Sequence, residues 1–117
     1  MDINQKVLIV DDDKFSTMIL KRLISGKVQS VEHVSSGEEA IDKINSGNYD
    51  LVFLDLNLPQ KSGIDVMNEV RDAHASTRFI GISADKKRSS KMMFEQAGIS
   101  CLLEKPINSQ EILNGQI

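Results

Sequence analysis

The sequence lacks the features that mark secreted, membrane-spanning or nucleic-acid-binding proteins. Its only cysteine, Cys101, excludes an internal disulfide and suits a reducing compartment. No apolar stretch approaches the roughly 20 residues of a transmembrane helix, and residues 1–6 carry no signal-peptide pattern. With 14 basic and 17 acidic residues, the chain has no basic excess for binding a phosphate backbone. We therefore expect a cytoplasmic protein that contacts neither a membrane nor nucleic acid directly.

Motifs for several kinds of enzyme are also missing. There is no Gly-rich phosphate loop and no G-x-G-x-x-G, so nothing supports ATP or dinucleotide binding. No G-x-S-x-G nucleophile elbow occurs, and neither histidine has a metal-ligating neighbour at short spacing. Any chemistry must therefore rest on other side chains.

What the chain does have is a regular alternation of short apolar runs and amphipathic segments. Its 117 residues, 40% of them hydrophobic, suffice for one domain with one core. The apolar runs predict strands at 7–10, 28–34, 51–54, 79–82 and 101–103. Helical spacing predicts helices at 15–24, 36–45, 63–70, 86–97 and a short one from residue 108. Five strand-helix repeats predict an α/β fold with a parallel sheet covered on both faces.

Local patterns predict which residues are buried and where helices begin. In the first helical segment one apolar stripe is predicted to face the core, formed by Phe15, Met18, Ile19, Leu23 and Ile24. Cys101 lies in an apolar run and is predicted to be a buried thiol, whereas the polarity of 28–34 predicts an edge strand. Helix caps are predicted at Asp13, at Ser36 with Glu39 and at Ser62 with Asp65.

Polar residues stand at the ends of the predicted strands. They are Asp11 and Asp12 after the first strand, Asp55 after the third, Ser83 after the fourth and Lys105 after the fifth. In open parallel sheets, ligands bind at this edge, where the strand order reverses. If the first and third strands are neighbours, as in the order 2-1-3-4-5, the carboxylates converge and need a hard cation such as Mg²⁺. Asp55 is then the group placed to accept a phosphoryl group, with the lysine and the hydroxyl binding its oxygens.

Four short motifs occur in order, each at the end of a predicted strand. They are VLIVDD at 7–12, DLNLP at 55–59 with Gly63, SA at 83–84 and KP at 105–106. Over essentially its whole length the chain thereby resembles the receiver domain of two-component response regulators. The resemblance implies one domain over 1–117 with a flavodoxin-like (βα)5 fold, sheet order 2-1-3-4-5 and helices on both faces. The last helix is short for such a fold, which leaves open that the chain was cut from a longer one.

The resemblance also implies a phosphoacceptor and a metal site. Asp55 would accept the phosphoryl group. Asp12 would bind Mg²⁺ directly and Asp11 mostly through water. Asp55 itself and the backbone carbonyl of Asn57 would complete the protein ligands.

Other residues would bind the phosphoryl group and transmit its presence. Lys105, held by a cis bond to Pro106, would pair with the phosphoryl oxygens, and Ser83 would move in to hydrogen-bond them. Receivers commonly have Tyr or Phe at the switch position that Leu102 occupies here, and Phe where this chain has Ile107. The resemblance therefore supports the transfer chemistry and predicts an altered readout.

A further hypothesis concerns the lifetime of the phosphorylated state. Asn57 and Asp85 lie two residues after Asp55 and Ser83, respectively. Their polar side chains would orient a water molecule for attack on the acyl phosphate and so modulate dephosphorylation.

Together these inferences predict a phosphorelay signalling switch rather than a turnover enzyme. Its phosphodonor would be a sensor histidine kinase or a histidine phosphotransfer protein, and its output a changed affinity for a downstream protein or effector domain. Any of Phe15, Met18 and Ile19 that is exposed would lie beside the acidic pocket, where the kinase histidine must approach. A phosphorylation-independent receiver-like adaptor stays open as an alternative. So does a Mg²⁺-dependent phosphohydrolase, although Asp55-Leu56-Asn57 lacks the second aspartate that such an enzyme uses.

Overall fold

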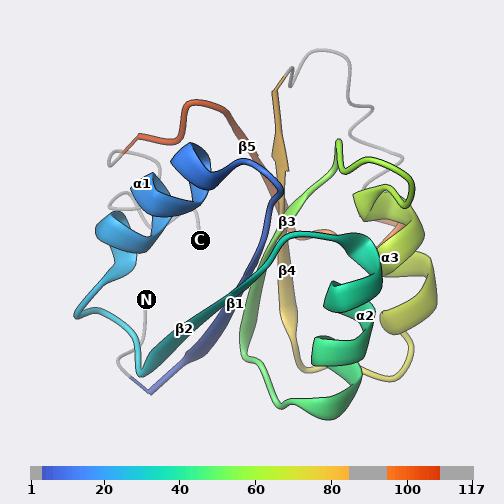
Figure 1. The fold of residues 1–117 in the computed structure, drawn as a ribbon. Coiled ribbons are helices and arrows are strands. Elements are labelled where there is room, and N and C mark those ends of the chain that lie inside the picture. Colours follow the sequence, from blue (N-terminus) through green and yellow to red (C-terminus); the bar gives the residue numbers. More distant parts are fainter. Residues whose placement is uncertain (1–3, 85–94, 109–117) are drawn as a thin grey trace.

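The computed structural model describes residues 4–84 and 95–108, in which strands and helices alternate as far as the fourth strand (Figure 1). The elements are β1 (Lys6–Val10), α1 (Lys14–Ile24), β2 (Ser30–Val34), α2 (Gly37–Ser46), β3 (Leu51–Asp55), α3 (Gly63–Val70), β4 (Arg78–Ser83) and β5 (Cys101–Glu104). The helices predicted for 86–97 and from residue 108 onward lie largely outside the described residues.

The five strands form one parallel sheet in the predicted order, β2-β1-β3-β4-β5. Figure 1 shows α1 on one face of this sheet and α2 and α3 on the other. The chain leaves β1 toward one face and β3 toward the opposite face, so the strand order reverses between these two neighbours. A crevice at the carboxyl ends of β1 and β3 is therefore the expected place for a ligand.

Each inner strand divides its side chains between two cores. In β1, Val7 and Ile9 pack in the core beneath α1, whereas Leu8 and Val10 pack in the core beneath α2 and α3. Because both faces of the sheet are covered, β1 from Val7 to Val10 and β3 from Leu51 to Leu54 are apolar at every position. Among the strands of the described residues, β2 pairs with β1 alone, and it is more polar, as predicted for an edge strand.

The buried stripe of α1 agrees with the predicted one only at the end of the helix, where Ile24 is buried and Leu23 packs against the core. Phe15 and Met18 are 64% and 47% exposed. The residues that this helix buries are Thr17, Leu20 and Ile24. Thr17 is polar, but its hydroxyl donates to the backbone carbonyl of Asp13 at 3.0 Å, so its burial leaves no unpaired donor. Apolar periodicity alone predicted the wrong buried face for the first part of α1. It treats threonine as an exposed residue, whereas Thr17 is buried with its hydroxyl hydrogen-bonded.

The predicted helix caps are present. The Ser36 side chain accepts a hydrogen bond from the N–H of Glu39 at the start of α2. At α3, Ser62 accepts from the N–H of Asp65, and the Asp65 carboxylate accepts from the N–H of Ser62, which completes a capping box. No helix in the described part of the chain is long and apolar enough to span a membrane.

Cys101 is half-buried, so the prediction of a buried thiol was wrong. This residue begins β5, which lies at the edge of the sheet and pairs with β4. Its side chain packs against the core beneath α1, but an edge strand leaves one flank less covered than an inner strand does.

Candidate functional site

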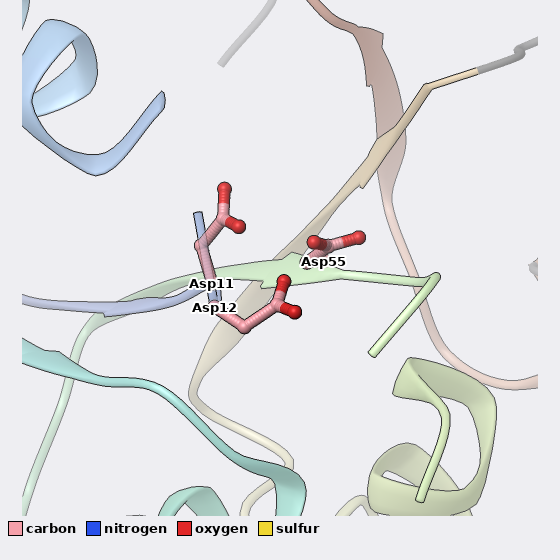
Figure 2. Close-up of side chains that lie close together, drawn as sticks. All are labelled: Asp11, Asp12 and Asp55. Carbon is pink, nitrogen blue, oxygen red and sulfur yellow. The ribbon is translucent and has the colours of Figure 1, made fainter. Parts of the chain in front are cut away.

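Carboxyl groups from two neighbouring inner strands meet where these strands end (Figure 2). Asp11 and Asp12 follow β1, and Asp55 is the last residue of β3. One carboxylate oxygen from each lies within 4.8 Å of the others. Asp11 and Asp55 are buried, whereas Asp12 is exposed. Pairing of β1 with β3 thus brings together the acidic residues singled out in the sequence, and we call these three residues the acidic cluster.

Lys105 supplies a positive charge to the acidic cluster. Its Nζ lies 3.2 Å from Asp11 Oδ1 and 3.2 Å from Asp55 Oδ2. The peptide bond from Lys105 to Pro106 is cis, as predicted, and the backbone N–H of Lys105 donates to the Ser83 carbonyl. The side chain of Lys105 therefore reaches from the end of β5 past β4 to the ends of β3 and β1.

Both buried carboxylates are also oriented by nearby backbone. Asp11 Oδ1 accepts from the N–H of Asp13 at 2.9 Å, and Asp55 Oδ1 accepts from the N–H of Asn57 at 2.8 Å. Asp13 itself caps α1, because its carboxylate accepts from the N–H of Phe15. These turns fix the carboxylates before any ligand arrives.

The electrostatics of the acidic cluster favour a bound cation. Burial is the main cause that raises the pKa of Asp11 from 3.8 to about 6; the N–H of Asp13 opposes this shift and the charge of Asp55 adds to it. For Lys105, burial lowers the pKa, but the carboxylates of Asp55 and Asp11 outweigh burial and raise the pKa above its ordinary value. The single positive charge of Lys105 therefore does not neutralise the three carboxylates. A divalent cation would offset the remaining negative charge.

The donor set of the acidic cluster fits Mg²⁺. Hard divalent cations prefer carboxylate and carbonyl oxygens, and the acidic cluster offers these donors and no sulfur or imidazole. Asp12 is exposed, so water molecules can complete the octahedral shell that Mg²⁺ retains.

Ser83 and Asn57 face each other across the ends of β4 and β3. Ser83 is buried, and its hydroxyl lies 3.5 Å from Asn57 Oδ1. The same oxygen accepts from the N–H of Ala84 at 3.4 Å. Asn57 thus contacts Asp55 through its backbone and the end of β4 through its side chain. Asp85, the other residue of the dephosphorylation hypothesis, lies outside the described residues.

Leu102, at the predicted switch position, belongs to a packed core. It is 7% exposed and lies in the core beneath α2 and α3. A Cβ built on Gly81 would lie only 2.9 Å from Leu102 Cδ1 and 3.3 Å from Leu56 Cδ1. Leu102 therefore fills the space over the backbone of β4, and Ile107 is buried in the other core.

Gly63 lets α3 begin directly against the end of β3. A Cβ at this position would lie 2.7 Å from the backbone oxygen of Asp55 and 2.9 Å from the Cα of Leu56. Both are backbone atoms that cannot swing aside, so the glycine four residues after the DLNLP motif is required for a steric reason.

One residue that contacts the acidic cluster was not identified from the sequence. His33, on β2, places Nε2 at 2.8 Å from the backbone oxygen of Asp11. The contact depends on the register between β1 and β2, in which Val10 pairs with Val34. The hydrophobic pattern of a single strand does not reveal its register with a neighbouring strand.

Comparison with known proteins points to one family. The sequence model described as the response regulator receiver domain matches residues 7–115. The chain is 34% identical over 108 residues to the autoinducer 2 sensor kinase/phosphatase LuxQ of Vibrio vulnificus, covering 92% of this chain and 13% of that protein. It is 32% identical over 108 residues to the transcriptional regulatory protein DltR of Streptococcus agalactiae, covering 92% of this chain and 48% of that protein. The chain thus spans less than half the length of these relatives.

A solved structure shares the fold and most of the length. The response regulator protein TrrA from Thermotoga maritima, solved in complex with Mg²⁺-BeF, superposes with a TM-score of 0.80 at 29% identity. The match covers 94% of this chain and 94% of that one.

Proposed function

The chain belongs to the response regulator receiver domain family, and on that premise we propose that it is a phosphorelay switch whose phosphoacceptor is Asp55. The observation that carries the proposal is the position of this carboxylate in the acidic cluster. One of its oxygens is held by the N–H of Asn57, and the other lies 3.2 Å from Lys105 Nζ. A buried, oriented carboxylate beside a cation suits attack on a phosphoryl group.

In the proposed transfer, a carboxylate oxygen of Asp55 attacks the phosphorus atom of a phosphohistidine. The P–O bond forms as the P–N bond breaks, and the imidazole leaves with the electron pair. Lys105, which now contacts Asp11 and Asp55, would then contact the phosphoryl oxygens and offset their charge. The Ser83 hydroxyl would donate to the same oxygens after leaving Asn57.

The cofactor of this proposal is Mg²⁺. Asp12 would hold it directly and Asp11 through water, with Asp55 and the Asn57 carbonyl as further ligands. When bound, the cation offsets negative charge on the phosphoryl oxygens. The proposal is supported by the proximity of the three carboxylates, since one oxygen of each lies within 4.8 Å of the others.

The phosphodonor we propose is a sensor histidine kinase or a histidine phosphotransfer protein. Support comes from a groove of about 270 Å³ beside the acidic cluster, which is lined by Phe15, Ile19 and Lys105 among others. Phe15 is 64% exposed and offers the donor an apolar contact next to the lysine.

The output would be a changed affinity for a downstream protein or an effector domain. LuxQ is a sensor kinase and DltR a transcriptional regulator, so relatives of both kinds carry a matching segment. We further propose that residues 1–117 form one cytoplasmic signalling domain, without direct contact to membrane or nucleic acid, that is not a turnover enzyme.

Dephosphorylation would be modulated by Asn57 and Asp85. Replacing both with leucine is expected to prolong the life of the acyl phosphate, because neither side chain could then orient the attacking water. An unchanged decay of the phosphorylated mass in the double variant would contradict this part of the proposal.

The decisive experiment is intact mass spectrometry after incubation with a small phosphodonor, with and without Mg²⁺. We expect one labile, Mg²⁺-dependent phosphoryl adduct on the wild type and none on Asp55→Asn. Asp72→Asn is the matched control, because the Asp72 side chain is 98% exposed and lies outside the acidic cluster. A folded wild type that takes no adduct from this donor or from a phosphorylated kinase domain would refute the proposal.

One observation favours a second candidate, a receiver-like adaptor that works without phosphorylation. The switch position holds the packed aliphatic Leu102 in place of a rotating aromatic ring. Partner affinity that stays equal with and without a phosphoryl mimic would support the adaptor, whereas a changed affinity would support the switch.

A further inference from the structure

His33 links the edge strand β2 to the first residue of the acidic cluster. Its Nε2 lies 2.8 Å from the backbone oxygen of Asp11. A carbonyl oxygen only accepts hydrogen bonds, so Nε2 must carry the hydrogen and donate. The Thr17 hydroxyl, 3.3 Å from the same nitrogen, donates to the Asp13 carbonyl and therefore acts as an acceptor toward His33. The N–H of His33 thus lies between two acceptors.

Asp11 is one residue past the end of β1, and β2 holds both of its backbone polar groups. The N–H of Asp11 donates to the Val34 carbonyl at 3.2 Å. Its carbonyl accepts from His33. The first contact is between backbone groups and needs no particular side chain. The second exists only because residue 33 carries a donor of suitable length.

The carbonyl that His33 holds belongs to the peptide joining Asp11 to Asp12. A peptide unit is planar, so fixing its oxygen fixes the orientation of the whole unit. The Asp11 carboxylate is fixed in addition by the N–H of Asp13, at 2.9 Å. Together these bonds determine the directions in which the carboxylates of Asp11 and Asp12 leave the backbone.

We propose that His33 is a positioning residue that preorganises the acidic cluster for Mg²⁺ without contacting the metal. The inference rests on the proposed magnesium site. Its physical basis is that carboxylates already held in place lose less conformational entropy when the cation binds. Residues that hydrogen-bond to metal ligands in other proteins orient those ligands in the same way.

The test is a titration with Mg²⁺ alone, followed by amide chemical shifts, on the wild type and His33 variants. His33→Leu removes the donor and is expected to weaken Mg²⁺ binding by about three- to tenfold, the value of one net hydrogen bond. His33→Gln is expected to restore most of the affinity, since its side-chain amide can donate to the same carbonyl. His33→Asn is too short to reach this carbonyl and is expected to behave like the leucine variant.

His74 provides the matched control. It is also half-buried and uses Nε2, at 2.9 Å from Asn45 Oδ1, but it lies in the turn before β4, at the opposite end of the sheet. His74→Leu should leave Mg²⁺ affinity unchanged. In the metal-free protein, the amide shifts of Asp12 and Asp13 should move in His33→Leu and return toward wild type in His33→Gln.

Each outcome separates the inference from the function on which it rests. Wild-type Mg²⁺ affinity in both His33→Leu and His33→Asn would overturn the inference and leave the proposed function standing. A loss that His33→Gln fails to recover would also overturn it, since packing of the ring rather than its donor would be responsible. A folded wild type that binds no Mg²⁺ would overturn the proposed function and the inference with it.

Discussion

Lys105 Nζ and Asp55 Oδ2 lie 3.2 Å apart although 50 positions separate the two residues in the sequence. Lys105 follows the edge strand β5 and Asp55 ends β3, so β4 lies between their strands. The lysine reaches across because its backbone N–H is tied to the carbonyl of Ser83, the last residue of β4. The same ammonium also contacts Asp11, so one cation serves both buried carboxylates.

Removing this ammonium should slow phosphorylation more than it perturbs the fold. Lys105→Met keeps the aliphatic stem but leaves the charge of the phosphoryl oxygens less compensated, and the rate should fall by about tenfold or more. The time course of the phosphorylated mass with a small phosphodonor measures the change. Lys43→Met, at an exposed ion pair with Glu32, is the control, and equal rates in the two variants would contradict a role for Lys105.

Asp11 should make the stability of the metal-free protein depend on pH. Its pKa is about 6 in the folded protein and 3.8 as an unperturbed group, so the folded state binds the proton more tightly. The stabilisation from this proton is complete below the lower value and is lost as the pH rises through the higher one. At neutral pH, Asp11→Asn should therefore raise the free energy of unfolding by about 1 kcal/mol.

Urea unfolding in the presence of a chelator, from acidic to neutral pH, measures this difference between wild type and Asp11→Asn. Added Mg²⁺ should reverse the order, since only the wild type retains the full set of carboxylates. Parallel stability curves for the two proteins across the whole range would contradict the raised pKa.

The fold and the acidic cluster follow from the sequence for a physical reason. Strands covered on both faces must be apolar at every position, so each one stands out, and parallel strands bring their polar end residues to one edge. Asp11, Asp55 and Lys105 were identifiable in this way. Side-chain contacts between neighbouring strands leave no such pattern, so the bond from His33 was missed.

The other errors also have local causes. Thr17 occupies a buried position of α1 where an apolar residue was expected. It can be buried because its hydroxyl donates a hydrogen bond to the Asp13 carbonyl. Hydrophobicity ranks Phe15 and Met18 as core residues, yet both are exposed. Cys101 was misjudged because its apolar run was read as a fully covered strand, although the expected order 2-1-3-4-5 places this strand at the edge of the sheet.

Glycine positions near the acidic cluster should differ in their tolerance of a methyl group. Gly63→Ala places Cβ 2.7 Å from the Asp55 carbonyl oxygen, a backbone atom, and should destabilise the fold by about 2 to 4 kcal/mol. Gly81→Ala meets the Leu102 methyl at 2.9 Å, which can shift, and should cost about 1 kcal/mol. Urea unfolding checks the ranking, and equal losses in the two variants would contradict the steric explanation.

Phe15 should matter for a protein phosphodonor and not for a small one. Its side chain is 64% exposed, so Phe15→Ala should change the free energy of unfolding by less than about 0.5 kcal/mol. In contrast, Leu20→Ala in the core should cost about 2 to 5 kcal/mol. Because Phe15 lines the groove beside Lys105, its loss should slow transfer from a phosphorylated kinase domain severalfold and leave the rate with a small donor unchanged.

Met18→Ala is the matched control for this experiment. Met18 is 47% exposed on the same helix but lines a different groove, together with His33 and Lys21. Transfer from the kinase domain should therefore proceed at the wild-type rate in this variant. If Phe15→Ala slowed both donors equally, the ring would act on the acidic cluster itself. If Met18→Ala slowed the kinase reaction as much as Phe15→Ala, the donor would contact α1 on a broader face than the groove beside Lys105.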